Sequence, residues 1–164
     1  MIHEGVGSIF EVGASIIVNP VNMQGISGKG LAKEIKDRFP WAFKDYVEFC
    51  ASGRIRDTPG LLSRSFVGDS GGASMGSAIW HLPTKDQWRD PSTLQLVEAG
   101  SVLLGNALRR GSLGHLFVHR HLIVAVPALG CGLGGLEWKQ VLPILWESFS
   151  GILGVDIILF PPQG

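Results

Sequence analysis

Short apolar runs and longer amphipathic segments alternate along this chain. The short runs are rich in Val, Ile and Leu and end at Gly, Pro or Asn, a pattern that predicts buried strands. The expected strands are Ser15–Val18, Leu61–Val67, Ser77–Leu82, His121–Val126 and Val155–Phe160.

The longer segments carry apolar residues three or four positions apart, which predicts helices that bury one face. In the first of them, Leu31, Ile35 and Phe39 are four residues apart and Pro40 follows. The expected helices are Leu31–Phe39, Trp41–Cys50, Ser92–Arg110 and Trp138–Phe149. Strands that alternate with helices indicate an α/β fold, with a mixed or mainly parallel sheet covered by helices on both faces.

Composition narrows the class of protein. A length of 164 residues is that of one domain, so we expect residues 1–164 to form a single domain. The 14 basic residues match the 14 acidic ones, so net charge gives no general attraction to nucleic acid or to a membrane. Two cysteines and the lack of a secretory signal favour the cytoplasm. A monomer with no membrane partner is the default expectation.

Three loops follow expected strands, at 19–31, 83–92 and 127–137. In open α/β sheets, ligands bind beyond the carboxyl ends of the strands, where loops lead into helices. These three loops are therefore the expected site.

Loop 19–31 joins two asparagines to a glycine-rich segment. Asn19 and Asn22 carry neutral amides that both donate and accept hydrogen bonds, which suits sugar hydroxyls. Gly28 and Gly30 allow backbone N–H groups to approach a ligand at a helix start. Lys29 is followed by glycine rather than Ser or Thr, so the loop is not a P-loop. The alternative is a turn whose asparagines only bond to the backbone.

Loop 127–137 contains Gly130–Gly135, which matches G-x-G-x-x-G between a strand and a helix. A dinucleotide fingerprint also needs an acid at the end of the next strand, and Asp156 lies near its start instead. The loop is therefore expected to bind a phosphate or diphosphate through its N–H groups, without a Rossmann fold. Cys131 is either a nucleophile at a helix N-terminus or a small residue in a crowded loop.

Loop 83–92 places Lys85 three residues after the apolar strand. A lysine beside an apolar wall can attack a sugar carbon or form a Schiff base; the alternative is a solvated loop lysine. Trp88 is either a stacking platform or a core residue, and Arg89 is either an anion contact or a surface charge.

Two other patterns carry no chemistry. The segment "GDSGG", within the expected loop Gly68–Gly76, matches the nucleophile motif of chymotrypsin-like proteases, but this chain is too short and too helical for their two β-barrels. His119 and His121 are two apart with no cysteine or carboxylate nearby, which is a poor metal site.

The segments "NPVNMQGISGKGLA", "LPTKDQWRDPS" and "VPALGCGLGGLEW" together resemble a macrodomain, the ADP-ribose-binding fold. The likeness covers nearly the whole chain and is greatest to DarG-type antitoxin macrodomains and the related terminal ADP-ribose glycohydrolases. It implies a three-layer α/β/α macrodomain sandwich with a central mixed sheet of about six strands.

The resemblance also implies roles for residues. Lys85 would be the catalytic residue that faces the anomeric carbon of the distal ribose, and Asn22 would contact and position that ribose. No metal or cofactor is implied. The implied ligand-binding residues are Ser8, Ile9, Asn19, Gly28, Lys29, Gly30, Leu31, Ala32, Pro127, Gly130, Cys131, Gly132, Leu133, Gly134 and Gly135.

Three departures from the family pattern bear on mechanism. The glycohydrolase branch has an acid at the position of Gly134. DarG-type domains have glycine there, as this chain does. Ser8 replaces the usual aspartate of a "GDI" start, so it can hydrogen-bond adenine but carries no charge. Gln87 replaces a histidine, so residue 87 cannot serve as a general base.

The resulting hypothesis is an ADP-ribosyl hydrolase that acts on thymidine in single-stranded DNA and is paired with an ADP-ribosyltransferase toxin. The alternatives are a reader that binds ADP-ribose without catalysis, a phosphatase of ADP-ribose 1″-phosphate, and a hydrolase of carboxylate-linked protein ADP-ribose. Some basic residues can steer a DNA strand or be ordinary solvated charges. They are Lys29, Lys33, Arg54, Arg56 and Arg89.

Overall fold

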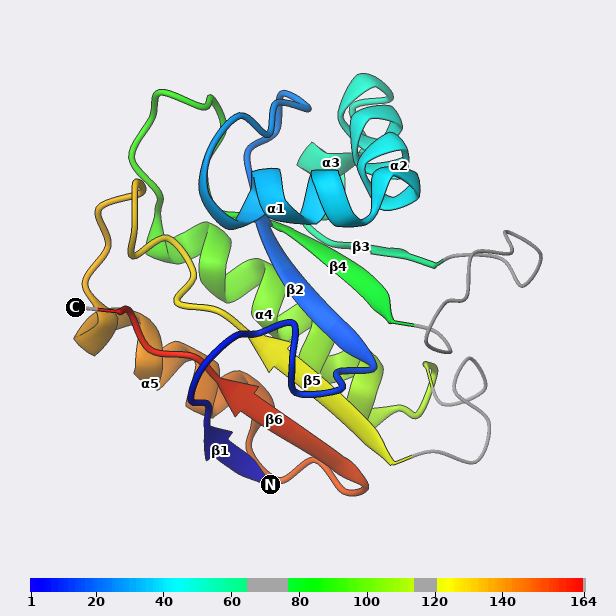
Figure 1. The fold of residues 1–164 in the computed structure, drawn as a ribbon, viewed down its shortest axis with the longest axis vertical. Helices are drawn as coiled ribbons and strands as arrows, with labels where there is room; N and C mark the ends of the chain where they lie inside the picture. Colours follow the sequence, from blue (N-terminus) through cyan, green and yellow to red (C-terminus); the bar gives the residue numbers. More distant parts are fainter. Residues whose placement is uncertain (65–76, 114–120, 164) are drawn as a thin grey trace.

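A six-stranded sheet runs through the protein (Figure 1). The computed structural model describes residues 1–64, 77–113 and 121–163. Its strands are β1 (Ile2–Glu4), β2 (Ile16–Val21), β3 (Leu61–Ser63), β4 (Ala78–Pro83), β5 (Leu122–Val126) and β6 (Val155–Leu159). They lie in the order β1-β6-β5-β2-β4-β3, and every neighbouring pair is parallel except the antiparallel β3 and β4. The predicted mixed sheet is confirmed.

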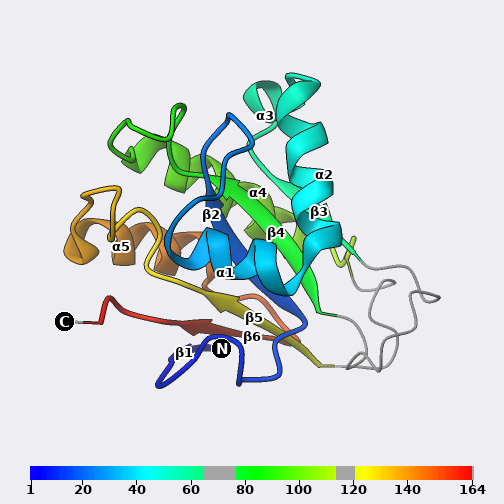
Figure 2. The same ribbon diagram turned by 45° about the horizontal axis from the view of Figure 1, so that its top comes forward.

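Helices cover both faces of this sheet, as Figures 1 and 2 show from two directions. On one face lie α1 (Gly30–Arg38), α2 (Pro40–Ala51) and the single-turn α3 (Arg54–Asp57). On the other face lie α4 (Leu94–Arg109) and α5 (Trp138–Phe149), which pack against each other. The expected three-layer α/β/α sandwich is confirmed.

Strand β2 shows why the central strands read as unbroken apolar runs. Ile16 and Val18 belong to the core beneath α4 and α5, whereas Ile17 belongs to the core that includes Ile35 of α1. Alternate side chains of a strand point to opposite faces, so a sheet covered on both sides needs apolar residues at every position.

The first glycine loop begins later than the sequence predicted. Strand β2 continues to Val21 because Asn19, Pro20 and Val21 pair in parallel register with the last residues of β4. The prediction that Asn19 lies in a loop is therefore wrong. Asn22 is the first residue beyond the strand.

Two elements were not predicted: β1 and α3. Strand β1 has only three residues and pairs Ile2 with Ile157 at the sheet edge, and α3 is one turn, so neither has enough length for a periodic pattern. The later part of the expected strand Leu61–Val67 and the expected loop Gly68–Gly76 lie outside the described residues, as does His119.

Candidate functional site

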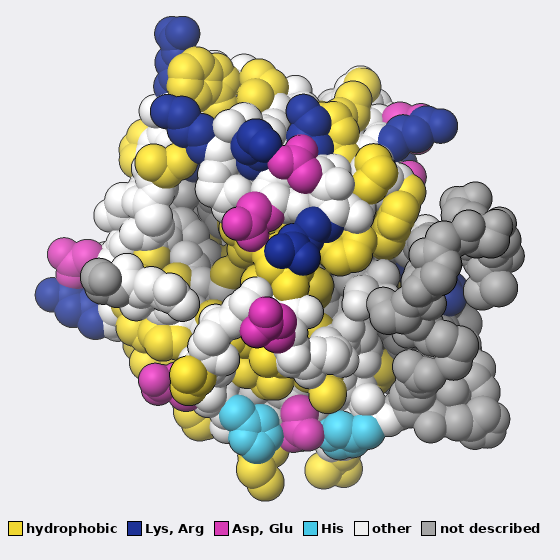
Figure 3. Space-filling model, in the orientation of Figure 1, with side chains coloured by type: hydrophobic (Ala, Val, Ile, Leu, Met, Phe, Trp, Pro, Cys, Tyr) yellow, Lys and Arg dark blue, Asp and Glu magenta, His cyan; other side chains and the backbone are white. Residues whose placement is uncertain are grey.

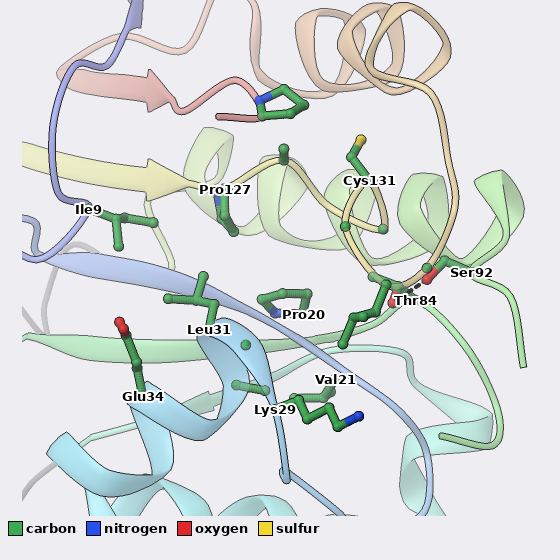
Figure 4. Close-up of a pocket in the computed structure, with 18 of the residues that line it drawn as sticks. Ile9, Pro20, Val21, Lys29, Leu31, Glu34, Thr84, Ser92, Pro127 and Cys131 are labelled. Atoms are coloured by element: carbon green, nitrogen blue, oxygen red, sulfur yellow. Dashed lines mark hydrogen bonds between the residues drawn. The ribbon is translucent and has the colours of Figure 1, made fainter. Parts of the chain in front are cut away.

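A cavity of about 920 Å³ opens at the carboxyl ends of β2, β4 and β5 (Figure 4). These neighbouring strands are parallel, so the loops that follow them meet at one edge of the sheet. Each of the three loops contributes to the walls, and the segments 7–10 and 160–163 complete them. The three loops that the sequence predicted to form the site thus meet at one cavity.

The first glycine loop brings the start of α1 to this cavity. Lys29 has extended backbone at the N-cap position, and no side chain caps the helix. Gly30, Leu31 and Ala32, whose N–H groups open the helix, all line the cavity. An uncapped helix start presents unsatisfied N–H groups and the positive end of the helix dipole, which together favour a bound anion.

The second glycine loop offers a further set of N–H groups. Its own turns use the N–H groups of Cys131, Gly135 and Leu136. Within the part of the chain that the structure describes, the N–H groups of 132, 133 and 134 have no acceptor, and these three residues line the cavity. The two loops together therefore suit a ligand with more than one phosphate.

Gly134 is packed so closely that the loop accepts only glycine there. A Cβ at this position would lie 2.6 Å from the Gly130 carbonyl oxygen and 2.7 Å from Ser92 Cβ, with Ser92 Oγ closer still. Ser92 is fixed in turn: its N–H donates to the Gly134 carbonyl at 2.9 Å, and its hydroxyl donates to Thr84 Oγ1 at 3.0 Å (Figure 4). Ser92 thus joins the loop after β4 to the loop after β5.

Lys85 lies just beyond the end of β4, partly buried in the cavity wall. Its neighbour Thr84 is buried and donates its N–H to the Val21 carbonyl at 2.9 Å. No hydrogen bond or ion pair joins the ammonium of Lys85 to another residue among those described. The amine is therefore free to meet a ligand, unlike a lysine held in a structural ion pair.

The other side of Lys85 is anchored through Asp86. The Asp86 carbonyl accepts from Met23 N–H at 2.8 Å, which ties this loop to the segment after β2. Its carboxylate accepts two hydrogen bonds from the Arg56 guanidinium, at 3.0 and 2.6 Å. This two-bond ion pair with Arg56 lowers the pKa of Asp86, although both side chains are about half exposed. Lys85 is thus held between two fixed neighbours, and it lines the same cavity as Asn22.

Asn22 has a side chain that shapes its own loop. Its Oδ1 accepts from Gln24 N–H at 2.9 Å, and its Nδ2 donates to the Ile26 carbonyl at 2.8 Å. The Tyr46 hydroxyl lies 2.8 Å from both Asn22 Oδ1 and the Asn22 carbonyl oxygen. One hydrogen of Nδ2 has no partner among the described residues, so the amide can still donate one bond into the cavity.

We expect Tyr46→Phe to weaken the site through Asn22. Tyr46 is fully buried, burial raises the pKa of its phenol, and its hydroxyl links α2 to both the side chain and the carbonyl of Asn22. Loss of this hydrogen bond should lower the free energy of unfolding by about 1–2 kcal/mol and loosen the Asn22 amide. A double-mutant cycle with Asn22→Ala on ADP-ribose affinity checks it. If Tyr46→Phe has the same effect on affinity with and without Asn22, the coupling is refuted.

Asn19 occupies a different environment from Asn22. It is buried within β2 and does not line the cavity. Its Nδ2 lies 3.2 Å from His81 Nδ1, and His81 Nε2 lies 3.0 Å from Ser63 Oγ. His81 also stacks on Tyr46, with ring centroids 5.5 Å apart. In this structure Asn19 therefore supports the buried polar cluster under the site, and does not reach the ligand space.

His81 should make stability depend on pH. Its burial lowers its pKa from 6.5 to about 3. In the unfolded chain His81 binds a proton below about pH 6.5, whereas in the folded protein its imidazole stays neutral until about pH 3. The contribution of His81 to the free energy of unfolding is therefore complete above pH 6.5 and is lost as the pH falls below that value. At pH 5 the loss should be about 2 kcal/mol. Chemical denaturation of wild type and His81→Gln at pH 7, 6 and 5 checks it, and parallel pH profiles would contradict it.

The cavity gathers most of the residues that the sequence singled out. Of the predicted catalytic and ligand-binding residues, Asn19 and Gly135 are the two that do not line it. Burial raises the pKa of Cys131, which disfavours the thiolate that a nucleophile requires. The predicted residues that line the cavity are Ser8, Ile9, Asn22, Gly28, Lys29, Gly30, Leu31, Ala32, Lys85, Pro127, Gly130, Cys131, Gly132, Leu133 and Gly134.

The sequence missed several residues that build the site. Thr84 and Ser92 belong to the expected loop 83–92, but the hydrogen bond between them forms only in the folded chain. Glu34 lines the cavity beside Ile9 and is the one carboxylate among the described lining residues (Figure 4). Glu34 lies in α1, one turn after Gly30 and on the side that faces the cavity. The helical spacing could have indicated this position, but the prediction considered only the loops.

Neither a metal-binding cluster nor a membrane-spanning helix occurs among the described residues. They contain no group of three or more His, Cys, Asp or Glu side chains placed to hold a metal ion. None of their helices combines the length and the apolar character that crossing a bilayer requires.

A family model described as the Macro domain matches residues 18–145. Over its full 164 residues the chain is 34% identical to the DNA ADP-ribosyl glycohydrolase of Mycobacterium tuberculosis, and spans 43% of that protein's length. It is 30% identical, over 85% of its own length and 36% of the relative's, to a Thermosipho africanus protein named DNA ADP-ribosyl transferase-DNA ADP-ribosyl glycohydrolase fusion protein.

Solved structures show the same kinship. The macrodomain of Mycobacterium tuberculosis DarG superposes with a TM-score of 0.81 at 32% identity, covering 99% of each chain. Thermosipho africanus DarTG in complex with ADP-ribose superposes with a TM-score of 0.78 at 26% identity, covering 96% of this chain and 40% of that one.

Proposed function

The chain belongs to the macro domain family, and from this premise we propose that it is an ADP-ribosyl hydrolase. It would bind ADP-ribose in the cavity at the ends of β2, β4 and β5 and release it from a thymine base in single-stranded DNA. The proposal assigns this activity to one macrodomain formed by residues 1–164.

The observation that carries the proposal is the free amine of Lys85 in a phosphate-binding cavity. Two glycine loops supply N–H groups for a diphosphate, and Asn22 keeps one amide hydrogen for a sugar hydroxyl. A protein that only bound ADP-ribose would need no lysine at the ribose. A buried wall and fixed neighbours on both sides favour a reactive role for this lysine.

The relatives support the choice of acceptor. The Mycobacterium tuberculosis relative is named for glycohydrolysis of ADP-ribosyl DNA, and the chain spans about two-fifths of its length. The fused relative carries a DNA ADP-ribosyl transferase in its name. We therefore propose that a partner transferase, acting in the cytoplasm, produces the modified DNA that this chain repairs.

The geometry suggests which residues bind the diphosphate, which orient the ribose and which take part in bond cleavage. The glycine loops would fix the diphosphate, and the Asn22 amide would orient the distal ribose so that its anomeric carbon faces Lys85. Lys85 would then either attack that carbon, breaking its bond to the base and leaving an adduct that water hydrolyses, or stabilise the developing charge while water attacks and the same bond breaks. Gly134 leaves no room for a side chain, so no carboxylate at that position takes part.

One set of assays tests the proposal. Purified protein would be given three substrates: ADP-ribosylated thymidine in a single-stranded oligonucleotide, carboxylate-linked ADP-ribosyl peptide, and ADP-ribose 1″-phosphate. We expect release from the oligonucleotide at a kcat/KM at least about 100-fold above that for the other two. If the protein turns over only the peptide or only the 1″-phosphate, that compound is the substrate, and thymidine in DNA is not the acceptor. Tight binding of ADP-ribose with no turnover would indicate a reader.

A further inference from the structure

The mouth of the cavity carries an aromatic side chain that the proposed reaction does not use. Trp88 lines the cavity, yet 49% of its surface is exposed. It lies three residues after Lys85 in the same loop. Tryptophan is usually well buried, so a half-exposed indole beside a reactive lysine calls for a binding role.

The turn that carries Trp88 is firmly held. Trp88 N–H donates to Gln24 Oε1 at 3.0 Å, which fastens it to the loop after β2. Gln87 N–H donates to Asp90 Oδ2 at 3.1 Å, and Asp90 N–H donates to the Gln87 carbonyl at 3.0 Å. A ring on a rigid turn loses little conformational entropy when a ligand binds.

A cation accompanies the ring. The Arg89 guanidinium lies over the Trp88 ring, 4.7 Å from its centroid. Arg56 is neutralised by its fork to Asp86, whereas no ion pair engages Arg89 within the described ranges. Figure 3 shows Lys and Arg side chains on the upper part of this face, interspersed with hydrophobic and with acidic side chains. The ring thus has a free positive charge beside it.

We propose that Trp88 and Arg89 form the platform that holds the acceptor strand: one base of single-stranded DNA stacks on the indole, and Arg89 binds an adjacent phosphate. An aromatic face with a neighbouring arginine is the chemistry that binds unpaired bases without regard to their sequence. Because the platform stands beside Lys85, it places the bond between base and ribose at the reactive amine. This inference rests on the proposed function, and it names the residues that recognise the DNA part of the substrate.

Binding measurements in the Lys85→Ala protein test the platform without turnover. The probes are ADP-ribose alone and a labelled single-stranded oligonucleotide that carries ADP-ribosyl thymidine. We expect Trp88→Ala to weaken binding of the oligonucleotide by about tenfold to hundredfold, the value of one stacked base, and to leave ADP-ribose binding nearly unchanged. Trp88→Phe should restore most of the affinity. Arg89→Ala should reduce the slope of log Kd against log salt by about 0.7.

The chain supplies matched controls. Trp146 of α5 is 48% exposed and does not line the cavity, and Arg110 is exposed at the end of α4. Trp146→Ala and Arg110→Ala should leave the affinity for both probes unchanged. The platform is refuted if Trp88→Ala behaves like Trp146→Ala, or if it weakens ADP-ribose binding as much as oligonucleotide binding. An equal dependence on Trp88 for an ADP-ribosyl peptide would also refute it, in favour of a protein acceptor.

The outcome separates this inference from the proposed function. If wild type releases ADP-ribose from the oligonucleotide but Trp88 has no effect on affinity, the platform falls and the hydrolase stands. If wild type releases nothing while Trp88→Ala still weakens binding of the oligonucleotide selectively, the hydrolase falls and the platform stands as part of a DNA-directed reader.

Discussion

Replacing Lys85 by alanine should lower the release of ADP-ribose from the modified oligonucleotide by about 1,000-fold, because loss of a charge-stabilising group costs about 10²- to 10³-fold and loss of a nucleophile costs more. ADP-ribose affinity should change by no more than about threefold, since in the proposed complex backbone N–H groups of the two glycine loops hold the diphosphate. Single-turnover kinetics and calorimetry measure the two effects separately. A variant that keeps its rate would remove Lys85 from the mechanism.

Lys85→Arg distinguishes the two roles that the geometry allows for the amine. Arginine keeps the positive charge but is a poor nucleophile at neutral pH because it stays protonated. If Lys85 attacks the anomeric carbon, the arginine variant should be as slow as the alanine variant. If Lys85 stabilises charge, arginine should recover a large part of the rate. Lys139→Ala, at an exposed lysine paired with Glu137, is the control and should behave as wild type.

The location of the site followed from the sequence because one rule of sheet architecture is general. Loops that follow parallel strands meet at one edge, so three loops far apart in the chain could be assigned to one cavity before any coordinates. The glycine loops could be singled out because binding through backbone N–H groups favours glycine, which the sequence shows directly. Lys85 could be singled out because its place after an apolar strand is a local feature.

The division of labour between the asparagines could not be predicted in this way. Asn19 and Asn22 are three residues apart and chemically identical, but the pairing of β2 with β4 buries the first beside His81 and leaves the second at the cavity. Tyr46 was missed for the same reason: nothing in an amphipathic helix shows that one hydroxyl reaches a loop 24 residues earlier. Contacts of this kind depend on register and packing, which local patterns do not contain.

Replacing Gly134 by alanine should disorder the second glycine loop. The added Cβ would contact the Gly130 carbonyl, which is backbone and cannot rotate away, and it would displace Ser92 from Thr84. Overpacking of this kind lowers the free energy of unfolding by about 1–3 kcal/mol. Movement of the N–H groups that we propose bind the diphosphate should also weaken ADP-ribose binding by about tenfold or more. Thermal unfolding and calorimetry report the two effects.

Gly132→Ala is the matched control, because a Cβ at position 132 meets nothing within 4 Å. It should keep the stability of wild type to within about 0.5 kcal/mol. Equal destabilisation by the two variants would mean that the loop tolerates no change at all, and the packing against Ser92 would not be the reason.

The same contacts decide what an acid at position 134 can do. The resemblance implies an acid there in the terminal ADP-ribose glycohydrolase branch and glycine in DarG-type domains. In this chain a carboxylate would have to displace Ser92 before it could reach the cavity. Gly134→Asp should therefore lower stability as Gly134→Ala does, and should not raise the hydrolytic rate of the Lys85→Ala protein. A gain in rate from that double variant would show that the loop can rearrange around Ser92, and that lysine and carboxylate chemistry are interchangeable in this cavity.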